Sequence, residues 1–443
     1  MCLPSAESRG AAGSGAGATV GAVARYRGVP ATASSATGHG SCAVRAGRRE
    51  GGAEHMADST DSARERIGGG RPGAWVRLGG AASEGRRALE IGHAVGKVGT
   101  VVLEPWETAA AQRLKSEDPA VVVLCRRRTL IVDESETGPV HSNGLSYDQA
   151  EANGWVARSR AEEAITWEAH PGQWQLRIWD PACRTAWTEA IVRELSDSPF
   201  DGVLADDLDL YDHPLDLPLP DLGSDTQLRE AHDALIRQAG EALNGIGKLL
   251  IAVVEDARRM PARWVELSAW GGVCEPTWLS TAHGRMLDPG AARQQASLIT
   301  SEGPGRVPAE QLVLVRMPIA ASLLRRTELD QAQEQQLVRC GLAAFWVFGA
   351  GRGRFAAGSR DGTRAHWIPE MQWDLGAPLG PAEGVVSMWS REFEGGWAVV
   401  NLASDGRRRR HVTIPEGMLG PDGAPMRGTQ VLRAHQGILL RRA

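Results

Sequence analysis

The sequence lacks the features that mark disulfide scaffolds, metal sites and membrane proteins. Its six cysteines are scattered without a CxxC pair or a cysteine–histidine spacing, and no HxH or HExxH motif occurs, which argues against the common zinc sites. No run of about 18 apolar residues is present, so we expect no membrane-spanning helix. The N-terminus also lacks the basic and then apolar stretches of a secretory signal. These absences favour a cytoplasmic protein that uses neither a metal nor a membrane.

Signals for phosphate and nucleic-acid binding are also scarce. The glycine-rich stretches GSGAGA (13–18) and GAGRGR (349–354) match no phosphate-binding fingerprint in context or spacing. The formal net charge is −5, and the one dense basic run, at 407–410, falls in a predicted hairpin turn. Because nucleic acids are bound by broader basic surfaces, we expect no nucleic-acid partner.

Tyrosine and phenylalanine are rare, whereas tryptophan is abundant, with 3 Tyr, 5 Phe and 15 Trp in the chain. Most of the tryptophans are expected to pack in the core. The others suit a protein that holds flat apolar ligand faces, such as those of sugars or nucleobases, because the ring is wide and amphipathic.

The chain divides into three parts by pattern. Residues 1–70 are rich in Gly, Ala, Ser and Arg without lasting apolar periodicity, which predicts a disordered extension or, as the alternative, a misassigned start with Met56 as the true beginning. Between 71 and 375, short apolar runs alternate with longer amphipathic stretches, as in βα units. From 376 to 443 the period becomes two, with glycine-rich turns such as that in FEGGWAVVN, which predicts a small antiparallel β domain.

Eight apolar runs in the middle part predict a closed (β/α)8 TIM barrel of typical size. A doubly wound parallel sheet is the alternative, but eight runs favour closure. The stretch from 128 to 200 is too long for a plain helix and predicts an elaborate loop or an extra strand. The eight runs are 74–80, 99–106, 120–127, 201–207, 248–256, 270–278, 311–319 and 342–350.

Carboxylates, arginines and tryptophans dominate the ends of these runs, where a barrel gathers its functional residues. Two carboxylates flanking a glycosidic bond suffice to hydrolyse it, one as acid and one as nucleophile or base, without a cofactor. We predict Asp206 and Glu275, which end the fourth and sixth runs, as this pair. The alternatives are structural ion pairs with Arg126 or Arg316, or a calcium loop in DDLDLYD (206–212), which lacks the glycine and terminal glutamate of an EF-hand.

Further residues at the same run ends are predicted to bind substrate. Four tryptophans are candidates for stacking on sugars, and charged residues for contacts with hydroxyl groups. The predicted substrate-binding set is Arg77, Glu104, Trp106, Trp179, Asp180, Asp207, Trp278, Arg316 and Trp346.

One long segment resembles a known family. WDPACRTAWTEAIVRELSDSPFDGVLADDLDL (179–210) is similar to the core of the TIM-barrel proteins called hypothetical glycosyl hydrolase family 15, which are distantly similar to the endo-α-1,4-polygalactosaminidases. The matching residues are Asp180 and Pro181, Trp187 in the following helix, and FDGV (200–203) ending at Asp206. GLSYDQAEANGWVARS (144–159), GGVCEPTWL (271–279) and SREFEGGWAVVNLAS (390–404) resemble other segments of this family.

The resemblance implies a TIM-barrel glycoside hydrolase that acts on an oligo- or polysaccharide. The family often has Asn after the strand aspartate, where this chain has Asp207, and a second carboxylate there shifts the proton affinity of the first. A non-catalytic carbohydrate-binding barrel is the main alternative, and a structural or partner-binding protein is a third. The sequence specifies neither the sugar nor the oligomeric state.

Overall fold

The computed structural model describes residues 63, 66–67, 73–78, 84–167, 170–206, 225–281, 284–299, 307–359, 364–404 and 409–443. Most of the predicted N-terminal extension lies outside these residues, and so does Asp207. Among the described residues, no helix combines the length and the apolar character needed to cross a membrane.

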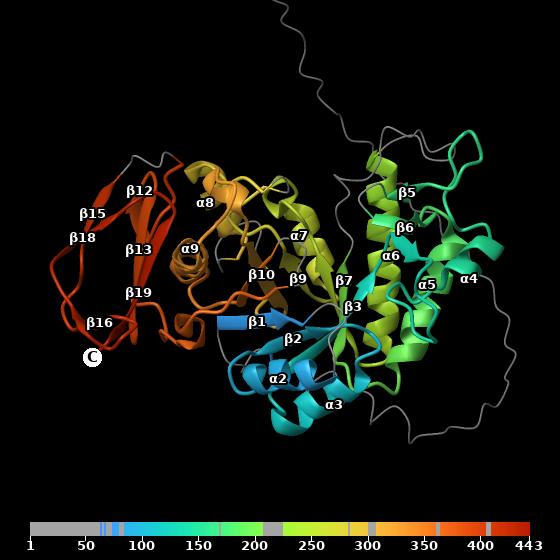
Figure 1. The fold of residues 1–443 in the computed structure, drawn as a ribbon, viewed down its shortest axis with the longest axis horizontal. Helices are drawn as coiled ribbons and strands as arrows, with labels where there is room; N and C mark the ends of the chain where they lie inside the picture. The colour runs from blue at the N-terminus through green and yellow to red at the C-terminus, as the bar shows by residue number, and fades with distance from the viewer. Residues whose placement is uncertain are drawn as a thin grey trace, which may run out of the picture. The chain divides into compact units, whose positions relative to one another are not determined.

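Eight parallel strands close into a barrel, which confirms the predicted (β/α)8 fold (Figure 1). Around the barrel the order is β1-β11-β10-β9-β8-β7-β3-β2. The strands are β1 (Gly73–Arg77), β2 (Thr100–Leu103), β3 (Val122–Arg128), β7 (Gly202–Asp206), β8 (Leu249–Val253), β9 (Gly271–Glu275), β10 (Leu312–Pro318) and β11 (Arg354–Gly358). The helices of these units are α2 (Glu84–Ala94), α3 (Thr108–Glu117), α5 (Pro181–Leu195), α6 (Asp225–Gly245), α7 (Pro261–Ser268), α8 (Pro289–Ser297) and α9 (Gln331–Gly349).

Side chains alternate along each strand between the barrel interior and the helix-covered outer face, because successive residues of a strand point to opposite sides. The inward residues form an apolar cluster of their own that includes Trp75, Val102, Leu124, Leu204 and Ile251. At the carboxyl ends of β1, β3 and β7, the inward positions beyond this cluster hold the charged residues Arg77, Arg126 and Asp206.

One of the eight predicted strands is wrong. The run 342–350 belongs to α9, and the eighth barrel strand is β11, a few residues later. A capping box of Asp330 and Gln333 starts α9. Nearly all of its second half is buried, and a helix that is apolar on all sides is buried on all sides. Gly341 lies inside α9, where an added Cβ would come within 3.1 Å of Met317 and Phe355.

The long connection after β3 carries a small sheet, as the sequence predicts. Strands β4 (Ile131–Asp133), β5 (Thr166–Trp167) and β6 (His170–Gln175) pair in the antiparallel order β4-β6-β5. The helix α4 (Tyr147–Ala152) belongs to the same insertion. Because the insertion follows the carboxyl end of β3, it lies on the side of the barrel where the strand-end residues gather.

Antiparallel strands make up the C-terminal part, in agreement with the period-2 pattern. Strands β13 (Met388–Phe393) and β14 (Gly396–Asn401) form the predicted hairpin, and β14 also pairs with β19 (Gln436–Arg442). Trp346 of α9 contacts Phe393 of β13 edge to face at 5.3 Å. The remaining strands are β12 (Glu383–Val385), β15 (Arg410–Thr413), β16 (Met418–Leu419), β17 (Pro425–Met426) and β18 (Thr429–Leu432), and the short 3-10 helices are η1 (Ala257–Arg259), η2 (Ala321–Leu324) and η3 (Pro369–Gln372).

Candidate active site

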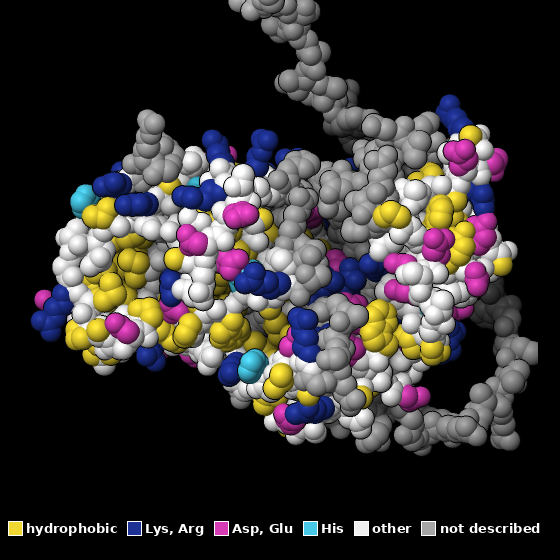
Figure 2. Space-filling view, viewed as in Figure 1, with side chains coloured by type: hydrophobic (Ala, Val, Ile, Leu, Met, Phe, Trp, Pro, Cys, Tyr) yellow, Lys and Arg dark blue, Asp and Glu magenta, His cyan; other side chains and the backbone are white. Residues whose placement is uncertain are grey.

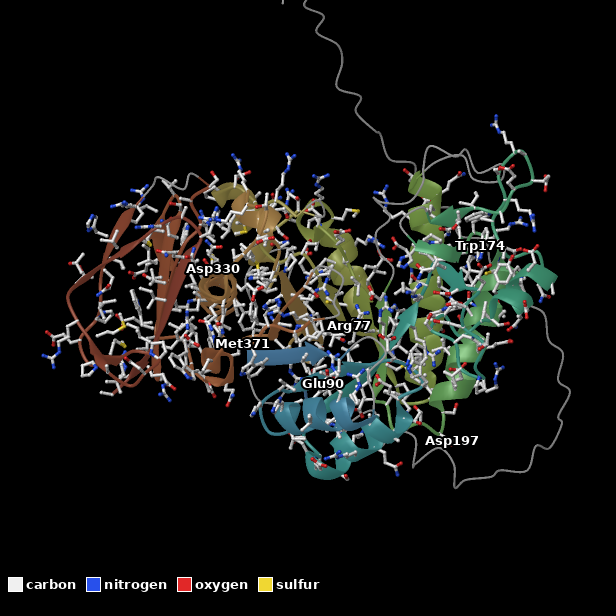
Figure 3. The ribbon with its side chains drawn as sticks, viewed as in Figure 1. Arg77, Glu90, Trp174, Asp197, Asp330 and Met371 are labelled. Carbon is white, nitrogen blue, oxygen red and sulfur yellow. The ribbon has the colours of Figure 1, made fainter. Side chains whose placement is uncertain are left out.

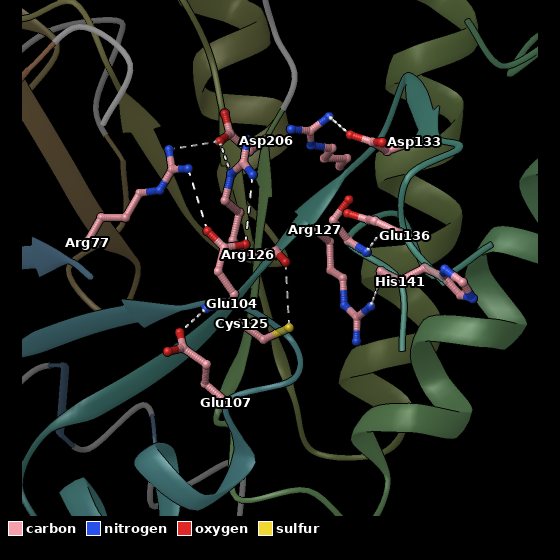
Figure 4. A network of polar contacts seen from close by, with 12 residues as sticks. Arg77, Glu104, Glu107, Cys125, Arg126, Arg127, Asp133, Glu136, His141 and Asp206 are labelled. Carbon is pink, nitrogen blue, oxygen red and sulfur yellow. Dashed lines mark hydrogen bonds and ion pairs between the residues drawn. The ribbon is translucent and has the colours of Figure 1, made fainter. Parts of the chain in front are cut away.

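Four charged side chains meet at the carboxyl ends of β1, β2, β3 and β7. Asp206 accepts a hydrogen bond at Oδ2 from Nε of Arg126 at 2.6 Å, and Nη1 of Arg77 lies 3.5 Å from the same oxygen. Glu104 lies between the same two arginines, with its oxygens 3.7 Å from Arg77 and 3.8 Å from Arg126. Figure 4 shows this strand-end cluster of Arg77, Glu104, Arg126 and Asp206, and Figure 3 shows Arg77 at the tip of β1.

The two-residue alternation of the strands brings this cluster together. Each member lies two residues beyond an inward apolar residue, as Asp206 follows Leu204 and Arg126 follows Leu124. Asp206 has the most accessible side chain of the four, with 23% exposed against 7% for Glu104. A reagent that approaches the barrel mouth therefore reaches the Asp206 carboxylate more readily than that of Glu104.

Burial and neighbouring charges set the electrostatics of the cluster. Desolvation, followed by repulsion from Arg126, lowers the pKa of Arg77 to about 10, and Asp206 and Glu104 oppose this effect. Arg77 therefore stays protonated at neutral pH. Burial also raises the pKa of the inward Cys274 thiol, which has Arg316, Asp206 and Glu275 as electrostatic neighbours. Cys274 thus stays a protonated thiol and is a poor nucleophile.

The structure does not bring Glu275 into the cluster, which corrects the predicted pairing with Asp206. Cys274 belongs to the interior cluster, so Glu275, the next residue, faces the outer side of β9. Its carboxylate accepts hydrogen bonds from the amides of Ala257 and Thr277, both at 3.0 Å, and from the Thr277 hydroxyl at 2.7 Å. Only 1% of Glu275 is exposed, and desolvation raises its pKa. Glu275 therefore ties the loop after β9 to η1.

Glu255 is a second carboxylate near the carboxyl end of the barrel. It lies two residues beyond Val253, the last residue of β8, and β8 pairs directly with β7. Glu255 is 8% exposed. The adjacent Asp256 has φ 47° and forms ion pairs with Arg258 at 2.7 Å and Arg259 at 2.5 Å. Both residues thus belong to the turn that joins β8 to η1.

The four predicted stacking tryptophans have different environments. Trp106, in the turn after β2, is 49% exposed. Trp278 is fully buried and donates a hydrogen bond to the carbonyl of Gly341 at 3.0 Å, and Trp346 is 1% exposed within α9. Neither of these two can stack on a sugar, which corrects both predictions. Trp179 is half-buried against the small cluster of Ala157 and Ile165.

The remaining predicted contacts are also placed by the fold. Asp180 caps α5, accepting a hydrogen bond from the amide of Ala182 at 2.8 Å, so its carboxylate has a structural role. Arg316 follows the inward Leu314 on β10 by two residues and acts on both Arg77 and Cys274 electrostatically. It therefore belongs to the charged mouth of the barrel.

A buried polar chain behind Asp206 was not predicted. The amide and hydroxyl of Thr129 both donate to the carbonyl of Asp206 at 3.1 Å. The Thr129 hydroxyl lies 3.4 Å from Nε2 of His232, whose Nδ1 is 3.2 Å from Arg263, and Arg263 pairs with Asp233 at 2.6 Å. His232 is fully buried, and desolvation lowers its pKa. A neutral ring that accepts from Arg263 can donate to Thr129, so this chain fixes the backbone of Asp206.

The described residues offer no grouping of three or more His, Cys, Asp or Glu side chains that could hold a metal ion.

Comparison with known proteins identifies related sequences and folds. The family model described as hypothetical glycosyl hydrolase family 15 matches residues 127–397. A search of curated proteins found no match.

Several solved structures are similar to this chain at low sequence identity. An α-amylase from Geobacillus thermoleovorans, complexed with acarbose, is 11% identical over 80% of this chain and 91% of its own, with a TM-score of 0.44. A debranching enzyme from Nostoc punctiforme is 10% identical over 84% of this chain and 99% of its own, with a TM-score of 0.45. An α-amylase from Malbranchea cinnamomea is 11% identical over 87% of this chain and 97% of its own, with a TM-score of 0.41. These likenesses are too distant to bear on substrate or mechanism.

Proposed function

The chain belongs to hypothetical glycosyl hydrolase family 15 and is thus a glycoside hydrolase, and we propose that it cleaves its saccharide at the carboxyl end of the barrel with Asp206 as the reacting carboxylate. The observation that carries this proposal is the strand-end cluster. It holds a partly accessible carboxylate at 2.6 Å from one guanidinium and 3.5 Å from another.

Asp206 has the surroundings of a nucleophile or general base. Arg126 and Arg77 compensate its negative charge and fix its orientation, since both contact Oδ2. In glycoside hydrolysis such a carboxylate either attacks the anomeric carbon or takes a proton from the attacking water.

Glu255 is the proposed proton donor to the leaving oxygen. It replaces Glu275 in this role, because the Glu275 carboxylate is fully occupied by the two amides and the hydroxyl on the outer face of β9. Glu255 lies two residues beyond the end of β8, the strand next to that of Asp206, and is 8% exposed. A carboxylic acid at this end of the barrel can protonate the leaving oxygen. Glu104, set between Arg77 and Arg126, holds the two arginines in place.

Substrate binding is proposed to use Trp106 and Arg316. The Trp106 ring is 49% exposed beside the end of β2 and offers a flat apolar face to a sugar. The reaction needs two carboxylates and water, and no cofactor.

The experiment that tests this function is turnover by matched variants on a panel of aryl α- and β-glycosides and amino-sugar polymers. We expect D206N and E255Q each to lower kcat by about 10²–10⁴-fold, whereas E275Q keeps kcat within about threefold per folded molecule. For E255Q, the loss should be smaller with aryl leaving groups that need little protonation. Full turnover by D206N would contradict the proposal, and sugar binding by the wild type without turnover would favour a non-catalytic barrel.

A further inference from the structure

A second polar cavity opens where the loops after β9 and β10 meet the C-terminal strands. Two adjoining hollows of about 700 and 730 Å³ share Leu323, Arg325, Ser404 and His435 in their walls. This volume is in the range of small-ligand sites. We call it the basic pocket, defined by Arg285, Arg325, Arg326, Arg433, Ser404 and His435.

The arginines of the basic pocket differ from those at the barrel mouth. The four guanidinium groups are exposed, and no ion pair with a carboxylate joins any of them within the described part of the chain. Among the described residues, no Asp or Glu lines either hollow. Uncompensated positive charge that converges on a concavity attracts anions, and a guanidinium pairs well with carboxylate, sulfate or phosphate oxygens.

His435 lies in the same wall as the four arginines. It is 8% exposed, and its Nδ1 is fully buried, so this nitrogen does not face the hollow. Burial, followed by repulsion from Arg325, lowers the pKa of His435. The arginines therefore supply the positive charge of the pocket.

The fold holds these groups in fixed positions. Arg325 ends η2 in a left-handed conformation with φ 55°, and His435 has the same φ in the turn between β18 and β19. Gln336 of α9 donates to the carbonyl of His435 at 3.2 Å, and Gln436 donates to Gln336 at 3.3 Å. These contacts order the backbone of the pocket, so ligand binding has only the exposed arginine side chains to immobilise.

We propose that the basic pocket is a second glycan-binding site that takes an anionic sugar unit, through a carboxylate or sulfate group. The inference rests on the proposed function, because η2 follows β10 and the loop at 280–286 follows β9, both at the barrel end that carries Asp206. A polysaccharide engaged at the barrel mouth therefore has its flanking units on the same end of the molecule. Figure 2 shows basic side chains gathered over α8 and the C-terminal strands.

The test is binding of oligosaccharides of equal length to full-length D206N, measured by calorimetry. The probes are an oligogalacturonate, a sulfated glucan oligosaccharide, a neutral maltooligosaccharide and inorganic phosphate. We expect at least one acidic oligosaccharide to bind at least tenfold more tightly than the neutral one. Its affinity should fall with rising salt, because exposed charges are screened.

The matched variants are R325Q/R433Q in the pocket and R160Q, an exposed arginine in the insertion after β3. The double variant should weaken acidic-oligosaccharide binding by about 10- to 100-fold, while R160Q leaves it unchanged. The melting temperatures of these variants show whether each is folded. Unchanged affinity in R325Q/R433Q, or equal binding of neutral and acidic oligosaccharides, would overturn the proposal.

The remaining outcomes separate this inference from the proposed function. Phosphate that binds as tightly as the acidic oligosaccharides would make the pocket a free-anion site and also overturn the glycan proposal. Retained hydrolysis by D206N, with arginine-dependent binding intact, would overturn the role of Asp206 and leave the pocket standing.

Discussion

Asp206 and Glu275 both end a barrel strand, yet they lie in opposite environments. Asp206 faces inward, is 23% exposed on its side chain and contacts two arginines. Glu275 faces outward, is 1% exposed and is bound by two amides and a hydroxyl. In a parallel barrel the phase of the alternation, more than the residue type, separates an accessible carboxylate from a buried one.

The tryptophans give the largest expected difference between the two environments. Trp278 is fully buried and bonded to α9, so W278A should lower the free energy of unfolding by about 3–5 kcal/mol. W106A, which removes a ring that is half exposed, should change it by less than about 1 kcal/mol. Chemical denaturation measures the free energy of unfolding of both variants, and equal losses in W278A and W106A would contradict the prediction.

Glu275 should give the next largest effect. E275A leaves the amides of Ala257 and Thr277 without an acceptor in a buried place, which should cost about 2–4 kcal/mol of unfolding free energy. D206N keeps the shape of its side chain at the accessible mouth and should cost less than about 1 kcal/mol. Denaturant unfolding of E275A and D206N measures both free energies, and a larger loss of stability in D206N than in E275A would contradict the prediction.

Much of the fold could be predicted from the sequence because βα alternation survives in short apolar runs. Seven of the eight barrel strands overlap predicted runs, with bounds that differ by at most one residue where a strand extends beyond its run. The run 342–350 was misassigned because a helix buried on all sides and a buried parallel strand both give an uninterrupted apolar run. The true strand β11 (Arg354–Gly358) is short and follows a glycine-rich turn.

The phase of each strand could not be predicted for the same physical reason. GGVCE is buried at all five positions, so no polar–apolar alternation reveals that Cys274 points inward and Glu275 outward. The cluster of Arg77, Glu104 and Asp206 follows from strand ends, which the sequence does mark. The chain from Thr129 through His232 to Arg263 joins residues from three separate elements, and a single helical histidine gives no signal of it.

A smaller effect than those at Trp278 and Glu275 is expected from His232, whose titration should make the free energy of unfolding depend on pH. Its pKa is lowered in the folded state by burial, so protonation favours the unfolded chain. The stabilising contribution of neutral His232 is therefore fully present above the unfolded pKa of about 6.5. It is lost as pH falls from there toward the folded pKa, by at most about 1.4 kcal/mol of unfolding free energy per pH unit. Unfolding free energies between pH 5 and 8 measure this slope. Because the H232Q side chain cannot titrate, this variant should show a flatter dependence of unfolding free energy on pH. An equal slope in H232Q would show that other groups cause it.

Trp106 gives the smallest effect and tests whether the inward mouth binds sugar at all. Its exposed ring gains nothing for stability in solution, but stacking on a sugar face removes apolar surface from water, which for one ring is worth about 1 kcal/mol. W106A should therefore raise KM about fivefold with kcat nearly unchanged, and W106F, which keeps a flat ring, should recover most of the loss. Steady-state kinetics on a glycoside that the wild type cleaves separates KM from kcat. A fall in kcat alone would indicate that Trp106 acts in the chemical step. No change in either constant would show that Trp106 does not contact the substrate.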